Sequence, residues 1–152
     1  VAVLGIENII VCGHSQCGAM GAILQPEQLN DLPAAKAWFN HCEATRRIVQ
    51  RKYQTVSQPE LVRCAAEENV LVQMNNLSTH PVVAARLATD ELRVYGWYYD
   101  IGSGSVSQFD QRQGEFLELG ASAHATSPMP VSSAGRTVNS LHLHHDVASR
   151  VG

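Results

Sequence analysis

The chain has 152 residues, of which 45% are hydrophobic and 16% charged, so it is long and apolar enough for one globular domain with a hydrophobic core. Its net charge of −3 and its scattered cations argue against nucleic acid as a partner, because Arg46-Arg47 and Arg51-Lys52 are typical of a solvated helix face. No apolar run is as long as a membrane span, and no signal peptide is visible.

The N-terminal third predicts a strand and two helices. Val1 to Gly5 is typical of a last helical turn stopped by glycine, and Glu7 to Cys12 of a buried strand. Gly18 to Leu24 predicts a short helix. One amphipathic helix is expected from Ala34 to about Tyr53, with a buried stripe at helical spacing: Trp38, Cys42, Thr45 and Val49.

Two more helices are expected in the middle of the chain. Ser57 to Glu60 has a capping-box pattern with proline in the first turn, and a buried stripe that includes Cys64 continues toward Leu77. Ser78 or Thr79 is the expected cap of a following helix. We assign Cys42 and Cys64 to packing, and a cysteine beside a histidine in such a chain suits a reducing, cytoplasmic compartment.

From Leu92 to Tyr99 the apolar period changes to two, which predicts a strand. A turn at 102–104 precedes a short strand from Val106 to Phe109 and another from Glu115 to Leu119. The alternation of helices and strands predicts an α/β fold. After Gly120 the composition shifts to Ala, Ser, Thr, Pro and Gly, so we expect a folded domain over 1–120 and a flexible low-complexity tail over 121–152.

The turn after the first strand carries two soft metal ligands. His14 and Cys17 have i, i+3 spacing, which favours one zinc ion bound by both. A zinc site takes three or four protein ligands, so at least one more must come from elsewhere. Cys12 has the strand period to point the same way as His14, although a buried strand cysteine that only packs is the plainer interpretation.

Other histidines give weaker signals. His142, His144 and His145 form a cluster in the tail that either binds a divalent ion weakly or is incidental. His41 and His80 are expected on a helix face and at a helix start, as surface or capping groups.

The run from Glu7 to Met20 resembles the second half of the zinc signature of the β-class carbonic anhydrases. Later landmarks of that family follow in order at Asn69 to Leu77, at Pro81-Val82 and at Gly96 to Asp100. The resemblance implies a mostly parallel central sheet flanked by helices, and reversible hydration of carbon dioxide to bicarbonate. It also implies zinc bound by His14 and Cys17, with the backbone N–H of Gly18 facing the substrate.

The family takes another zinc-binding cysteine from a Cys-x-Asp-x-Arg motif upstream of this turn, and no such motif occurs in these residues. The chain therefore reads as the C-terminal part of a β-carbonic anhydrase domain. We expect these 152 residues alone to be inactive.

The resemblance also implies a homodimer or an assembly of dimers, and the aromatic run Tyr95 to Tyr99 presents large groups on both faces of its strand. In some family members a tyrosine near this strand lines an inhibitory bicarbonate pocket, and Tyr99 matches it by position. The features are most similar to the cyanobacterial carboxysomal branch, which suggests carboxysomal localisation with the tail as a docking segment for scaffold proteins.

Two rival functions remain open. Besides a carbonic anhydrase, the chain could belong to a non-catalytic truncated homologue. It could also belong to a zinc hydrolase on the same scaffold that acts on a carbon dioxide analogue such as carbon disulfide. Comparing turnover of carbon dioxide and carbon disulfide separates the two enzymes.

Overall fold

The computed structural model describes residues 1–120, and the expected tail with its histidine cluster lies outside this part of the chain. Within residues 1–120, none of the helices combines the length and the apolar character needed to cross a membrane. The helices are α1 (Gly18–Leu24), α2 (Pro33–Phe39), α3 (Glu43–Lys52), α4 (Gln58–Ser78) and α5 (Pro81–Ala88), with 3-10 turns at Pro26–Leu29 and Asn40–Cys42. The strands are β1 (Asn8–His14), β2 (Arg93–Tyr99), β3 (Val106–Asp110) and β4 (Glu115–Glu118).

The sheet has the strand order β1-β2-β3-β4 and is mixed. β1 and β2 are parallel, with Asn8 opposite Arg93 and His14 opposite Tyr99, because helices connect them. The short turns after β2 and β3 allow only antiparallel pairing with the next strand. The α/β prediction is confirmed, but the expected predominance of parallel pairing does not hold among the described strands.

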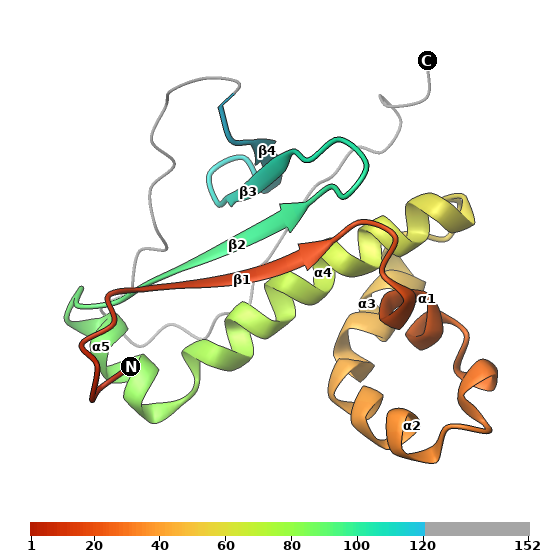
Figure 1. Ribbon diagram of the computed structural model, residues 1–152, viewed down its shortest axis with the longest axis horizontal. Coiled ribbons are helices and arrows are strands. Elements are labelled where there is room, and N and C mark those ends of the chain that lie inside the picture. The colour runs from red at the N-terminus through yellow and green to blue at the C-terminus, as the bar shows by residue number, and fades with distance from the viewer. Residues whose placement is uncertain (121–152) are drawn as a thin grey trace.

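Helix α4 lies along β1 and β2 on one side of the sheet, and α1 to α3 gather at the end where β1 stops (Figure 1). Two glycines permit this close approach. A Cβ at Gly13 would lie 2.9 Å from Val70 Cγ2 and 3.1 Å from the Ala66 carbonyl oxygen, and one at Gly96 would lie 2.5 Å from Met74 Sδ. These glycines set the distance between α4 and the strand that ends at His14.

Gly13→Ala is therefore expected to lower the free energy of unfolding by about 1–3 kcal/mol, because the new methyl group meets the backbone of α4, which cannot move aside cheaply. Gly21→Ala is the matched control, since a Cβ at Gly21 has no neighbour within 4 Å and alanine favours the helix. Urea denaturation of both variants measures the difference. Equal stability of Gly13→Ala and the parent chain would contradict the close-packing argument.

Buried apolar residues form two clusters around α4. One cluster joins α4 to α1, α3 and β2, and consists of Met20, Ile23, Val49, Ala65, Ala66 and Tyr98. The other joins α4 to α5 and β2, and consists of Val70, Met74, Val83, Leu87, Leu92 and Val94. The first cluster supports the turn that carries His14 and Cys17.

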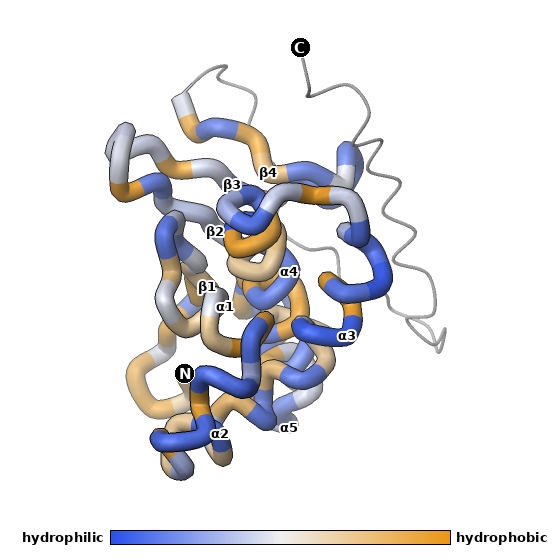
Figure 2. The backbone as a smooth tube through the Cα atoms, turned by 90° about the vertical axis from the view of Figure 1, so that its right-hand side faces the viewer, coloured by the Kyte–Doolittle hydropathy of each residue, from blue (hydrophilic) through white to orange (hydrophobic). Residues whose placement is uncertain are grey.

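Helix α3 is held to α4 by a buried polar contact as well as by Val49. Lys52 Nζ and the Tyr53 hydroxyl both donate to Glu68 Oε1 at 2.7 Å, and Glu68 is only 6% exposed. Burial, together with the nearby Glu68 carboxylate, raises the pKa of Tyr53 far above its usual value. Figure 2 shows that α3 is otherwise largely hydrophilic, so this paired carboxylate and a narrow apolar stripe fix its position.

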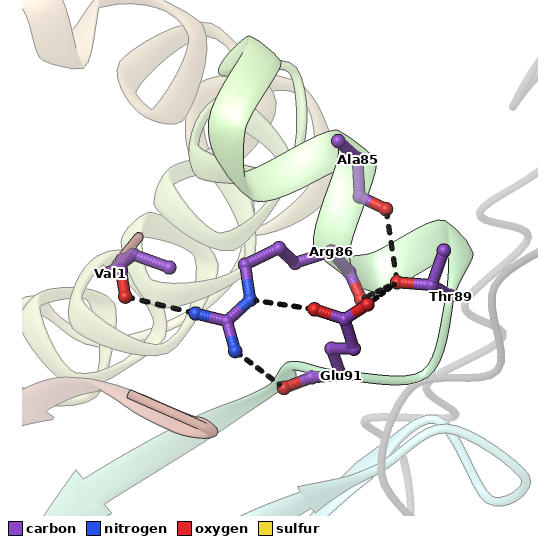
Figure 3. Close-up of polar contacts among 5 residues, drawn as sticks. All are labelled: Val1, Ala85, Arg86, Thr89 and Glu91. Atoms are coloured by element: carbon purple, nitrogen blue, oxygen red, sulfur yellow. Dashed lines mark hydrogen bonds and ion pairs between the residues drawn. The ribbon is translucent and has the colours of Figure 1, made fainter. Parts of the chain in front are cut away.

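Arg86 of α5 holds the first residues of the chain in place (Figure 3). Its guanidinium donates to the Val1 carbonyl oxygen at 2.9 Å and pairs with the Glu91 carboxylate at 3.4 Å. Residues 2–5 form a turn rather than the predicted end of a helix, and Gly5 adopts a left-handed φ of +61°. The chain thus enters β1 from beside α5, at the opposite end of the sheet from His14.

The prediction of a single helix from Ala34 to about Tyr53 is wrong, because a 3-10 turn at Asn40–Cys42 separates α2 from α3. Thr45 and Val49 are fully buried as expected, but Trp38 is 70% exposed and its ring contacts only the edge of His41 among the described aromatic pairs. Asparagine and histidine are weak helix formers, and the interruption includes Asn40 and His41.

Of the two predicted helix caps, the one before α4 is confirmed in position and the one before α5 is wrong. Ser57 is the N-cap of α4, but its side chain makes no capping hydrogen bond. Ser78 and Thr79 do not cap α5, whose N-cap is His80, also without a side-chain capping bond. Their hydroxyls instead donate at 2.7 Å to carbonyl oxygens in the last turn of α4, which is the alternative that short hydroxyl side chains offer at a helix end.

Candidate metal centre

The candidate metal centre is the turn between β1 and α1. His14 is the last residue of β1, and Cys17 is the N-cap of α1. Between them Gln16 adopts φ +54°, a left-handed conformation that is uncommon for a side chain of this kind. The strand ends two residues later than predicted, so His14 belongs to the sheet and Cys17 to the helix start.

The imidazole of His14 has a defined proton position. His14 is exposed, and its Nδ1 lies 2.8 Å from the carbonyl oxygen of Ser15. A carbonyl oxygen only accepts hydrogen bonds, so Nδ1 must carry the hydrogen in this contact. The neutral ring then has its lone pair on Nε2, which is the arrangement of a metal-ligating histidine whose other nitrogen is bonded to the protein.

Cys17 is half-buried and packs against the cluster that joins α1, α3 and α4. Its carbonyl oxygen accepts the Gly21 N–H at 3.0 Å in the first turn of α1, which fixes the backbone of the cysteine. Cys42 packs against the same cluster, as expected, and its pKa is raised by burial and by the nearby Cys17. Cys64 is buried, and this desolvation raises its pKa to about 12, as in a packing cysteine.

Cys12 does lie on the same face of β1 as His14, but it is exposed rather than buried, and its thiol contacts the Gly13 carbonyl oxygen at 3.3 Å. Partial desolvation raises the pKa of the Cys12 thiol, so a smaller fraction of it is the metal-binding thiolate at neutral pH. Among residues 1–120 no three His, Cys, Asp or Glu side chains come together in a group that would hold a metal ion. His14 and Cys17 are therefore brought to one turn, but no third protein ligand joins them in the described part of the chain.

Gly18 is the first residue of α1, and a Cβ added there would have no neighbour within 4 Å. The first N–H groups of a helix have no partner within the helix, so this one is available to a ligand by geometry. Tyr99 pairs with His14 across the two parallel strands and is 39% exposed, which places its ring beside the turn on the sheet.

A second segment, which sequence reasoning missed, supports this turn. The last residue of β2 contributes the Tyr99 carbonyl oxygen, which accepts the Ser15 N–H at 2.9 Å. The loop that follows contributes the Ile101 N–H, which donates to Ser15 Oγ at 2.8 Å. Asp100 closes the same loop by accepting from Ser103. The signal that was available is the Asp-x-x-Ser pattern, which is typical of an Asx turn.

Comparison with known proteins finds one family. A family model described as carbonic anhydrase matches residues 1–106. The chain is 43% identical over 112 residues to a carbonic anhydrase of Synechococcus elongatus, covering 73% of this chain and 41% of that protein. It is 42% identical over 119 residues to a carbonic anhydrase of Pseudomonas aeruginosa, covering 78% of this chain and 54% of that protein.

Among solved structures, the β-carbonic anhydrase CcaA superimposes with a TM-score of 0.74 at 40% identity, covering 76% of this chain and 52% of that chain. The chain thus spans about half the length of the proteins that it matches. The matched residues run from the first residue through β1, the helices and β2 to the start of β3. The fold matches that of a β-class structure. The chain belongs to the carbonic anhydrase family and has the β-carbonic anhydrase fold.

Proposed function

We propose that the protein to which these residues belong catalyses the reversible hydration of carbon dioxide to bicarbonate, with a zinc ion held by His14 and Cys17. The observation that carries the proposal is the hydrogen bond from His14 Nδ1 to a backbone carbonyl oxygen, which leaves Nε2 as the free ring nitrogen three residues before a half-buried cysteine. Membership of the carbonic anhydrase family supports the reaction.

The donor set suits zinc, because imidazole nitrogen and thiolate sulfur are ligands that this metal prefers. When bound, zinc lowers the pKa of water from 15.7 to about 7 and so supplies a nucleophile at neutral pH. The chain's own residues then have distinct roles. Cys17 and His14 would hold the ion. The N–H of Gly18, in the first turn of α1, has no partner within the helix and would donate to a substrate oxygen.

The third ligand is proposed to be a cysteine from a segment outside residues 1–120, by analogy with the upstream Cys-x-Asp-x-Arg motif of the family. The outer edge of β1 has no partner strand among the described residues. A segment that pairs there would lie directly beside Cys12 and His14, whose side chains alternate with those that face α4.

Stopped-flow hydration of carbon dioxide by protein that carries such an upstream segment tests the proposal. We expect turnover that requires zinc and that exceeds turnover of carbon disulfide. A protein that holds zinc at His14 and Cys17 but hydrates no carbon dioxide would contradict the enzymatic assignment and favour the non-catalytic homologue. Faster turnover of carbon disulfide would favour the alternative hydrolase.

We further propose a homodimer or an assembly of dimers. The face of the sheet opposite α4 carries Ile10, 47% exposed, and the aromatic rings of Tyr95, Trp97 and Tyr99, with no helix over it in the described residues. Parallel strands, such as β1 and β2, normally lie in sheets that are covered on both faces. Sedimentation analysis of the protein tests this, and a monomer at micromolar concentration would contradict it.

The similarity to the Synechococcus elongatus protein supports a place in the cyanobacterial branch, with carboxysomal localisation and scaffold binding through residues 121–152 as the finer proposal. The nearly equal identity to the Pseudomonas aeruginosa protein means that similarity alone does not single out this branch. Co-purification of shell or scaffold proteins with the chain, before and after removal of residues 121–152, tests the docking role. Equal recovery in both samples would contradict it.

A further inference from the structure

Ser15 is a buried polar residue of the candidate metal centre, and its N–H, its hydroxyl oxygen and its carbonyl oxygen all make hydrogen bonds. It lies between His14 and Cys17 and is only 8% exposed. Its N–H donates to the Tyr99 carbonyl oxygen at 2.9 Å, and its Oγ accepts the Ile101 N–H at 2.8 Å. Its carbonyl oxygen accepts His14 Nδ1–H at 2.8 Å. One residue therefore connects the end of β2 to the imidazole.

The loop at residues 100–105, which contacts Ser15, is stabilised by hydrogen bonds within itself. The Asp100 carboxylate accepts the Ser103 N–H at 2.8 Å and the Ser103 hydroxyl at 3.1 Å, and the Gly104 N–H donates to the Asp100 carbonyl oxygen at 2.8 Å. Gly104 adopts φ +75°, which glycine tolerates at no steric cost. The loop thus presents the Ile101 N–H to Ser15 from a fixed position.

We propose that Ser15 is a positioning residue that fixes the tautomer and ring orientation of His14 and the placement of Cys17 by tying their turn to the loop at residues 100–105. The inference rests on the proposed function, in which His14 and Cys17 hold zinc. Without the Ser15 hydroxyl, the turn loses its bond to Ile101 of the loop and keeps only the bond to Tyr99 of β2, and the left-handed Gln16 between the ligands is free to relax. The Ser15 carbonyl oxygen that orients His14 is then held less firmly.

A merely structural role for Ser15 predicts a different result. A buried hydroxyl that only stabilises the fold costs stability when it is removed, but leaves the imidazole tautomer and the metal affinity unchanged. Groups that orient a ligating histidine typically change metal affinity about 10–100-fold when they are removed. The two roles are therefore separated by measurements on His14 and on metal binding, not by stability alone.

The test compares Ser15→Ala with Ser15→Thr, which retains the hydroxyl, and with Ser78→Ala. Ser78 is the control because its hydroxyl is also hydrogen-bonded to the backbone, donating to the Asn75 carbonyl oxygen at 2.7 Å, but at the far end of α4 from the turn. The first measurement is the ¹⁵N chemical shifts of the His14 ring in the metal-free 152-residue chain, above the pH at which the ring is protonated. The second is titration with Co²⁺, followed by thiolate-to-cobalt absorption.

We expect parent chain, Ser15→Thr and Ser78→Ala to show the Nδ1–H tautomer, and Ser15→Ala to show a mixture with Co²⁺ affinity at least about 10-fold weaker. A parent-like tautomer and affinity in Ser15→Ala would overturn the inference. If Ser15→Ala does not fold, Asp100→Ala, which opens the supporting loop, replaces it with the same expectation and the same overturning result. A third outcome separates the two proposals. If Ser15→Ala shifts the His14 tautomer but no variant shows cobalt–thiolate absorption, even in protein that carries the upstream cysteine, the result would support positioning by Ser15 and contradict the zinc function.

Discussion

Cys17→Ser is expected to remove zinc from the protein and abolish hydration of carbon dioxide. The substitution replaces a half-buried thiol at the start of α1 by a hydroxyl, which is a poor zinc ligand. Loss of a direct ligand should cost more than the roughly 10–100-fold in affinity that follows removal of an outer hydrogen-bond partner. Metal analysis of the purified protein, with the upstream segment present, measures the loss.

Cys12→Ser is the matched control for this prediction. Cys12 is a cysteine of the same strand face as His14, but it is exposed and its thiol bonds only to a neighbouring carbonyl oxygen among the described contacts. Zinc content and turnover should stay near the parent values. Full zinc occupancy in Cys17→Ser, or loss of zinc in Cys12→Ser, would contradict the assignment of the ligands.

The 152-residue chain by itself is expected to bind zinc weakly and to show no hydration of carbon dioxide above the buffer rate. Residues 1–120 bring only His14 and Cys17 to the turn, and zinc sites need at least three protein ligands. Exposed apolar side chains on the face opposite α4, such as Ile10, should also reduce solubility.

Joining an upstream segment with the Cys-x-Asp-x-Arg motif before Val1 is expected to restore zinc binding and turnover. Stopped-flow measurements on the two proteins at equal zinc concentration make the comparison. The same segment with its cysteine changed to serine is the control, and should remain inactive. Robust turnover by the 152-residue chain alone would contradict the incomplete site and make Cys12 the first residue to test as a third ligand.

The local parts of the fold could be predicted from the sequence because they depend on neighbouring residues. Helix α1 has the expected bounds, Gly18–Leu24, and the alternation from Leu92 onward correctly predicts β2. The break between α2 and α3 was missed because Trp38 has the spacing of a buried residue, although it projects from the fold. Helical periodicity alone does not show where a helix leaves the surface that it packs against.

In the candidate site, too, the local features could be predicted from the sequence and the long-range contacts could not. Residue types and i, i+3 spacing single out His14 and Cys17, and the structure places both on one turn. The contact from Ser15 to Ile101 joins residues 86 positions apart, and depends on the parallel pairing of β1 with β2. No short sequence pattern contains that information, so the support of the turn is visible only in the fold.

Zinc-edge X-ray absorption spectroscopy tests the central claim, that His14 and Cys17 bind one zinc ion, most directly. We predict that zinc is coordinated by imidazole nitrogen at about 2.0–2.1 Å and by sulfur at about 2.3 Å in protein that carries the upstream segment. Cys17→Ser should reduce the sulfur contribution of any residual bound zinc, and His14→Ala should remove the imidazole scattering. A shell of oxygen and nitrogen without sulfur, or a spectrum unchanged in both variants, would contradict the claim.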